Sequence, residues 1–337
     1  MPRRSDGNSE GSCVKIILQW ASVLPRAISL LVHAAYPFDG GVVMPDNKNP
    51  ADLHSVYEKI HDERRRRVEE HKRSVALKKA EAGRQLNILA DGDSWFSYPL
   101  SWDVIDYVRQ DGNPTPIVLD LAVAGDPTTA TLGVEKREQI INTLSDPEQG
   151  EFDALLFSGG GDDVAGDQFC LWITDNTGSD RGINQKAFSD ILGVVETAYR
   201  DLFAICGDIQ PNCKIFIHSY DFARPTGVGA CPLLTGGYAR GPWLKPSLDY
   251  RQWTDFTSAS ALVEALLREL DTLFLALEGE YKPRVVYVKT QGTLIPPQSI
   301  DDKTSDWANE LHPTEPGFEK IATKFLAALR NSFPGRI

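Results

Sequence analysis

Five short apolar runs, separated by longer amphipathic segments, constrain the fold of this chain most strongly. The runs cover residues 86–90, 116–123, 154–157, 214–218 and 284–288. They are mostly apolar at successive positions, as expected of strands that are buried on both faces. Between and after them, single apolar stripes predict helices over residues 188–203, 262–277 and 318–329. This alternation predicts a doubly wound, five-stranded parallel sheet covered by helices on both faces, a three-layer α/β/α fold.

Composition excludes several classes of protein. The chain has 337 residues, of which 42% are hydrophobic, so it contains enough apolar material for a substantial core. Its formal net charge of -12 repels polyanions over most of the surface. We therefore expect no nucleic-acid partner.

The first 84 residues are predicted to be an N-terminal extension, and residues 85–337 the α/β domain. Residues 53–84 are dense in charge and contain no glycine or proline before Gly83, which predicts one long, exposed helix. Its basic run, residues 64–67, is expected to contact an acidic face of the same protein, with an acidic partner as the alternative.

Residues 14–36 are the one candidate for a targeting or membrane segment. Polar residues and a proline interrupt it, namely Lys15, Gln19, Pro25, Arg26 and His33. Such a segment is poor material for a membrane span and lacks the unbroken apolar run of a signal peptide. We expect no stable membrane span, and a cytoplasmic location is favoured over export although the compartment stays open.

A serine directly after the first predicted strand is the strongest candidate for a chemical role. The carboxyl ends of parallel strands form the crevice in which ligands bind. Residues 91–94 read Asp-Gly-Asp-Ser, and a serine on the turn from strand to helix exposes its hydroxyl at this edge. The alternative is a serine that only caps a helix.

A nucleophilic serine needs a base, and two histidines lie outside the N-terminal extension. His312 follows the last predicted strand and precedes the last helix, so it reaches the same crevice as Ser94. His218 ends the fourth strand, and we interpret it as a pocket or core histidine. His312 is therefore the predicted base.

Two further loops converge on this crevice. Gly125 follows the second strand, and its backbone N–H can point at a developing oxyanion. A glycine-rich turn, residues 158–163, follows the third strand. Donors aimed at an oxyanion each contribute roughly 3 kcal/mol of transition-state stabilisation.

In sequence order, these features resemble the four motif blocks of the SGNH, or GDSL, hydrolase family. The blocks are Gly92-Asp93-Ser94, Gly125, Gly161-Asp162-Asp163 and Asn309-Glu310-Leu311-His312-Pro313. The resemblance runs from about residue 86 to residue 330 and implies a flavodoxin-like sheet and a serine esterase, lipase or acetylesterase without a cofactor or metal. It implies Ser94 as nucleophile, His312 as base, and the N–H groups of Ser94 and Gly125 as oxyanion donors.

The chain departs from the family pattern at two positions. Asp162 stands where the family has an asparagine, the third oxyanion donor, and Asn309 stands where the family has the acid of its triad. An ionised carboxylate only accepts hydrogen bonds, so Asp162 helps only if it is protonated or turned away. Asn309 can orient the imidazole of His312 but cannot stabilise an imidazolium as a carboxylate does.

Residues 221–255 form a long irregular segment that we expect to be a lid inserted in the α/β domain. Four aromatic side chains are the candidates for substrate contact, namely Trp95, Tyr238, Trp243 and Trp253. The expected substrate is a small-molecule, lipid or carbohydrate ester, while its acyl chain, its alcohol and the oligomeric state stay open.

Two other functions remain possible. The first is a catalytically impaired relative that keeps the pocket as a binding module. The second is a Mg²⁺-dependent phosphatase, in which Asp91 and Asp93 would hold the ion with Asp162 and Asp167. Trp95 and the absence of a suitable lysine weigh against the phosphatase, which would also leave His312 without a role.

Overall fold

In a computed structural model, which describes residues 62, 64–77, 85–178, 182–230 and 241–337, a five-stranded parallel sheet forms the centre of the molecule. Its strand order is β2-β1-β3-β4-β5. The strands are β1 (Asn87–Gly92), β2 (Ile117–Asp120), β3 (Ala154–Ser158), β4 (Lys214–His218) and β5 (Val285–Val288). This order confirms the predicted doubly wound, flavodoxin-like sheet.

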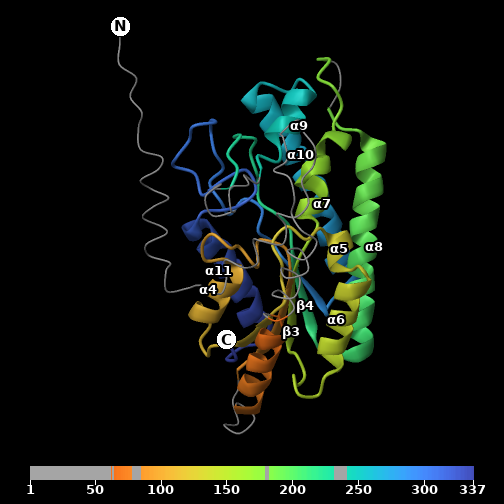
Figure 1. The fold of residues 1–337 in the computed structure, drawn as a ribbon, viewed down its shortest axis with the longest axis vertical. Coiled ribbons are helices and arrows are strands. Elements are labelled where there is room, and N and C mark those ends of the chain that lie inside the picture. Colours follow the sequence, from red (N-terminus) through yellow and green to blue (C-terminus); the bar gives the residue numbers. More distant parts are fainter. Residues whose placement is uncertain (1–61, 63, 78–84, 179–181, 231–240) are drawn as a thin grey trace, which may run out of the picture.

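Helices cover both faces of the sheet, which confirms the three-layer α/β/α architecture (Figure 1). One face carries α4 (Val104–Asp111) and α11 (Glu315–Ser332). The other carries α5 (Thr128–Thr131), α6 (Val134–Ser145), α8 (Gln185–Ile209) and α10 (Phe256–Tyr281). Three shorter elements lie in the loops, namely α7 (Gly161–Ala165), the 3₁₀ helix η2 (Asp167–Leu171) and α9 (Lys245–Tyr250).

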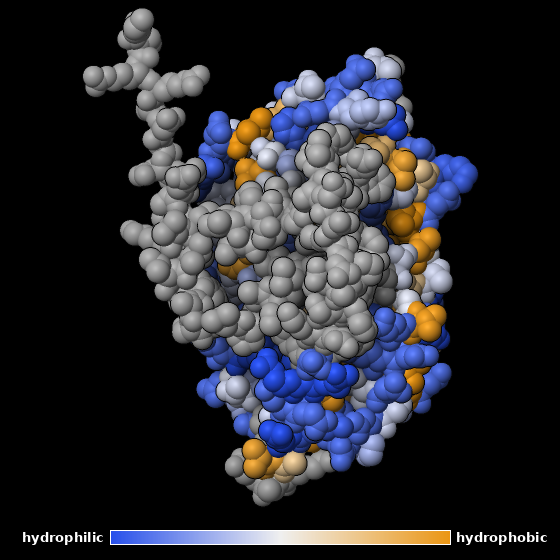
Figure 2. All heavy atoms as spheres, viewed as in Figure 1, coloured by the Kyte–Doolittle hydropathy of each residue, from blue (hydrophilic) through white to orange (hydrophobic). Residues whose placement is uncertain are grey.

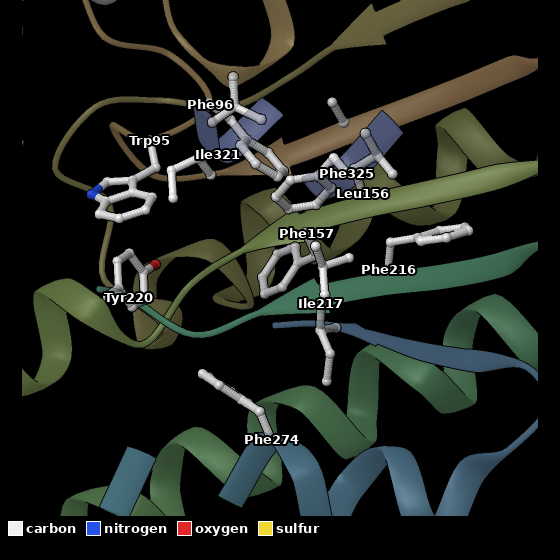
Figure 3. Packing of buried hydrophobic residues seen from close by; sticks show 14 of the residues in the cluster. Trp95, Phe96, Leu156, Phe157, Phe216, Ile217, Tyr220, Phe274, Ile321 and Phe325 are labelled. Carbon is white, nitrogen blue, oxygen red and sulfur yellow. The ribbon is translucent and has the colours of Figure 1, made fainter. Parts of the chain in front are cut away.

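Alternate side chains of the buried strands fill the two layers of the core. On β3, Leu156 and Phe157 point to opposite faces of the sheet (Figure 3). Phe157 packs edge-on against Tyr199 of α8, with ring centroids 5.1 Å apart. On the other face, Phe325 of α11 packs against Phe96, with centroids 5.4 Å apart. Apolar side chains therefore pack on both faces, as the unbroken apolar runs predict.

Helix caps fix where the chain leaves and re-enters the sheet. The Asp103 side chain accepts from the backbone N–H groups of Ile105 and Asp106 and begins α4. The Thr314 hydroxyl accepts from Gly317 N–H and begins α11 with a proline in its first turn. Since Thr314 is two residues after His312, this cap also fixes the end of the histidine loop.

Residues 64–77 form a helix that is only partly exposed, which corrects the expectation of an exposed helix. His71 and Val75 are buried against the α/β domain. Arg67 lies 3.8 Å from Asp120, and Lys72 lies 2.9 Å from Asp146. The basic residues of this helix thus contact acidic residues of the same chain, as the preferred interpretation predicted.

Polar residues dominate the described part of the surface that is turned to the viewer, with apolar residues in small groups (Figure 2). Among the described residues, no helix has both the length and the apolar character needed to cross a membrane.

Candidate active site

The residues at the end of β1 form a tight turn that presents Ser94. Gly92 has φ 137°, and a Cβ atom there would lie 2.0 Å from the carbonyl oxygen of Ser158 on β3. No side chain fits in this space, so the turn requires glycine. The N–H groups of Phe96 and Ser97 both donate to the Asp93 carbonyl. Ser94 thus lies in a short turn and not at the start of a regular helix, since α4 begins ten residues later.

The structure brings Ser94, His312 and Asn309 together in one hydrogen-bonded line. The Ser94 Oγ atom lies 2.8 Å from Nε2 of His312, and Nδ1 of His312 lies 2.9 Å from Oδ1 of Asn309. Asn309 Oδ1 also accepts from the backbone N–H groups of Leu311 and His312. Since this oxygen accepts all three bonds, Nδ1 carries the proton and Nε2 is free to accept from the serine.

Aromatic rings surround the His312 imidazole. Tyr98 stacks on it with centroids 4.4 Å apart, and the Tyr98 hydroxyl accepts from the Asn309 amide. Trp243 packs edge-on, with centroids 5.5 Å apart. Burial lowers the pKa of His312 to about 3. His312 is therefore a neutral base over the whole physiological range of pH.

The backbone N–H groups of Ser94 and of Gly125 have no acceptor among the described residues. Gly125 has φ 81° in the turn after β2, a conformation that favours glycine. These are the two donors that the sequence predicts for an oxyanion. A backbone N–H without a protein partner is free to donate to a ligand.

A small, partly open cavity adjoins Ser94. Its lining residues are mostly apolar, and the full set is Asp93, Ser94, Trp95, Gly161, Asp162, Ala165, Tyr220, Asp221, Ala223, Leu267, Trp307 and Leu311. Asp162, in the first turn of α7, shares this cavity with the nucleophile. That Asp162 occupies the place of a third oxyanion donor stays a prediction.

The four aromatic candidates for substrate contact have different positions. Trp95 lines the cavity, and its indole N–H donates to the carbonyl of Leu311, which joins the serine turn to the histidine loop. Trp243 contacts His312, whereas Tyr238 lies outside the described residues. Trp253 does not line the cavity and instead donates to the carbonyl of Thr174, so the structure does not support its predicted contact with substrate.

Glu310, between Asn309 and His312, is a buried residue that the sequence did not single out. Its Oε1 atom accepts from the N–H groups of Gly227 and Lys245, and its Oε2 atom from those of Trp243 and Leu244. Burial raises its pKa, although these four N–H bonds oppose the rise. The Glu310 carboxyl group thus binds the backbone at Gly227 and at residues 243–245, which include Trp243.

Of the four aspartates of the phosphatase interpretation, Asp91 and Asp93 have protein partners. Asp91 Oδ1 lies 3.2 Å from the ammonium group of Lys136, whereas Asp93 bonds to Ser158 and Tyr220. Within the described part of the chain, no three His, Cys, Asp or Glu side chains are grouped to hold a metal ion. The carboxylates thus face different partners and do not converge on one ligand.

No protein-family model and no curated protein sequence matches the chain. Several solved structures are similar to it. One is the lipase Lip_vut3 from a goat rumen metagenome, at 13% identity and TM-score 0.46, covering 72% of this chain and 97% of that one. Another, from Parabacteroides merdae and described as a GDSL-like lipase, has 14% identity and TM-score 0.36, covering 72% and 96%.

A carbohydrate esterase of family 3 from Talaromyces cellulolyticus is also similar, at 13% identity and TM-score 0.38, covering 73% of this chain and 97% of that one. The family name suggested by the four motif blocks thus recurs among similar structures. At TM-scores of this size, the similarities carry no conclusion about activity. A function has to be inferred from the side-chain geometry.

Proposed function

We propose that this protein is a serine ester hydrolase that acts through an acyl-enzyme on Ser94. The observation that carries the proposal is the distance of 2.8 Å between Ser94 Oγ and an imidazole nitrogen whose tautomer Asn309 fixes. A serine paired with an oriented, neutral histidine is the arrangement that activates a hydroxyl as nucleophile.

The proposed reaction uses only groups that the site contains. His312 Nε2 takes the proton of Ser94 as Oγ attacks the ester carbonyl, and the oxyanion accepts from the N–H groups of Ser94 and Gly125. His312 then gives the proton to the leaving alcohol. In the second half, His312 removes a proton from a water molecule whose oxygen attacks the acyl carbonyl. His312 then gives this proton to Ser94 Oγ as the bond between Oγ and the acyl carbon breaks and the acid leaves. The apolar lining beside Ser94 favours an uncharged acyl group.

The second candidate, an impaired relative that only binds its ligand, is favoured by Asp162. Its carboxyl group lines the same cavity as Ser94, and an ionised group there opposes the charge of the oxyanion. The two candidates share a pocket and differ in turnover.

Hydrolysis of p-nitrophenyl acetate and butyrate separates them. The proposal expects turnover that is lost in Ser94→Ala and His312→Ala and kept in Ser97→Ala, a control serine of the same turn. An alkyl fluorophosphonate should label the wild type and not Ser94→Ala. Binding without turnover or labelling would support the impaired relative, and Mg²⁺-dependent hydrolysis of p-nitrophenyl phosphate that survives Ser94→Ala would support the phosphatase.

A further inference from the structure

A second serine and histidine lie directly behind the nucleophile, in a buried chain of hydrogen bonds. The Asp93 Oδ1 atom lies 2.7 Å from Ser158 Oγ, and this Oγ lies 2.9 Å from Nε2 of His218. Tyr220 bonds through its hydroxyl to the other oxygen of Asp93. Asp93, Ser158 and His218 have at most 1% of their surface exposed. They follow or end three neighbouring strands, β1, β3 and β4.

This chain of hydrogen bonds lacks one proton if Asp93 is ionised and His218 is neutral. His218 Nδ1 lies 2.7 Å from the carbonyl oxygen of Ser219, so Nδ1 carries a proton and a neutral His218 has only a lone pair at Nε2. The contacts Asp93–Ser158, Ser158–His218 and Tyr220–Asp93 then need three protons, and the Ser158 and Tyr220 hydroxyl oxygens also lie 3.2 Å from each other. The hydroxyl groups of Ser158 and Tyr220 supply two.

We propose that Asp93 supplies the third proton and is a neutral carboxylic acid at pH 7, held so by Ser158 and His218. The acid donates to Ser158 Oγ, Ser158 donates to His218 Nε2, and Tyr220 donates to the second oxygen of Asp93. Each of these three contacts then has one proton, and the longer Ser158–Tyr220 contact has none. Placing the proton on His218 instead would create two buried charges separated by a serine.

The surroundings favour the neutral form. Burial raises the pKa of Asp93, although its hydrogen bonds with Tyr220, Ser158 and Trp95 N–H oppose the rise, and burial lowers the pKa of His218 to about 4. The nearby carboxyl group of Asp163, on α7, raises the pKa of Asp93 further, and the phenol of Tyr199, on α8, also lies near Asp93. Among the described residues no lysine or arginine forms an ion pair with Asp93, whereas Lys136 pairs with its neighbour Asp91.

The consequence for catalysis rests on the proposed function. Asp93 precedes the nucleophile and lines the cavity in which the oxyanion would form. A negative charge there would oppose that oxyanion at low local dielectric. Ser158 and His218 are thus positioning residues, because they remove a charge from the site without contact with substrate.

The test is to remove the acceptor on His218. In His218→Phe, the Ser158 hydroxyl is free to donate to Asp93, which then receives bonds from Ser158, Tyr220 and Trp95 N–H and ionises more easily. Phenylalanine fits, since the neighbours of His218 include the rings of Trp95, Phe96 and Phe325 at 5.3–5.6 Å. His218→Gln is the conservative control, because its amide oxygen can accept from Ser158.

Infrared spectra detect the proton on the Asp93 carboxyl group directly. The difference between wild type and Asp93→Asn at pH 7 should contain the C=O stretch of a protonated carboxyl group, kept in His218→Gln and absent from His218→Phe. Nitrogen-15 NMR should show His218 as the neutral Nδ1–H tautomer. Ester turnover in His218→Phe should fall about tenfold at pH 7 with KM nearly unchanged, and the alkaline limb should move to lower pH.

Absence of the Asp93 band from wild type, its persistence in His218→Phe, or an imidazolium spectrum for His218 would overturn the proposal. These spectra need no substrate. If no ester is hydrolysed but the band is present, the proposed function fails and the neutral Asp93 stands.

Discussion

Asn309 is the residue at which this site differs most simply from a Ser-His-Asp triad. Its Oδ1 atom orients His312, but an amide lends no charge to the imidazolium that forms during attack. Asn309→Asp should therefore raise kcat by about 10-fold or more. The contact with Tyr98 is kept, because the tyrosine hydroxyl can donate to the new carboxylate.

The same variant has a predicted effect on pH dependence. A carboxylate beside His312 favours the charged imidazole and so raises the pKa of His312 from its value of about 3. Since the base must be neutral, kcat/KM of Asn309→Asp should fall at a higher pH on the acid side than that of the wild type. Full pH profiles of both enzymes measure this, and an acid limb near 6.5 in the wild type would contradict the buried, neutral His312.

Asp162 is the second departure from the family pattern, and its replacement tests the third motif block. Asp162→Asn supplies an amide donor of nearly the same shape to the cavity beside Ser94. A gain in kcat of about 10-fold fits roughly 1.4 kcal/mol of recovered stabilisation. Steady-state kinetics with p-nitrophenyl butyrate decide this. An unchanged or lower rate would mean that Asp162 is turned out of the oxyanion site or has another role.

At the scale of elements, the sequence predicts what repeats locally and misses what depends on distant contacts. The run over residues 214–218 coincides with β4, and the run over 86–90 overlaps β1, because full burial leaves an unbroken apolar pattern. The position of Ser94 and of His312 after a predicted strand indicates both residues. No such pattern marks Glu310 or the Ser158–His218 pair, whose partners lie 60 or more residues away.

Glu310 hydrogen-bonds to the backbone of Gly227 and of residues 243–245. Its replacement should loosen residues 243–245, where Trp243 packs against His312. In Glu310→Gln, one carboxyl oxygen becomes an NH₂ group that faces two backbone N–H donors. We expect faster hydrogen exchange of the amides of residues 243–245 and a KM raised by about tenfold, because Trp243 loses its support.

Glu315→Gln is the matched control, since Glu315 is exposed in the first turn of α11 and should leave both quantities unchanged. If hydrogen exchange and KM of Glu310→Gln equal those of the wild type, the four hydrogen bonds do not position residues 243–245.

The boundary between the N-terminal extension and the α/β domain stays a prediction. Residues 64–77, which lie on the N-terminal side of this boundary, contact the α/β domain. His71 stacks on Phe152, with ring centroids 5.5 Å apart, and its Nε2 atom lies 2.8 Å from Asn87 Oδ1 at the start of β1. This helix therefore packs against the end of the sheet opposite to Ser94. Its removal should leave the α/β core folded but less stable.

Two point variants on this helix measure how much it contributes. His71→Ala removes a buried ring with hydrogen bonds to the side chains of Asn87 and Gln149, and should lower the free energy of unfolding by about 2 kcal/mol. Leu77→Ala, at a position 66% exposed on the same helix, should change it by less than about 0.5 kcal/mol. Urea denaturation of both variants gives the comparison. Equal stabilities of the two variants would show that the helix is an independent extension. The expected difference would make the helix part of the cooperative fold, in which it stabilises β1, the strand that Ser94 follows.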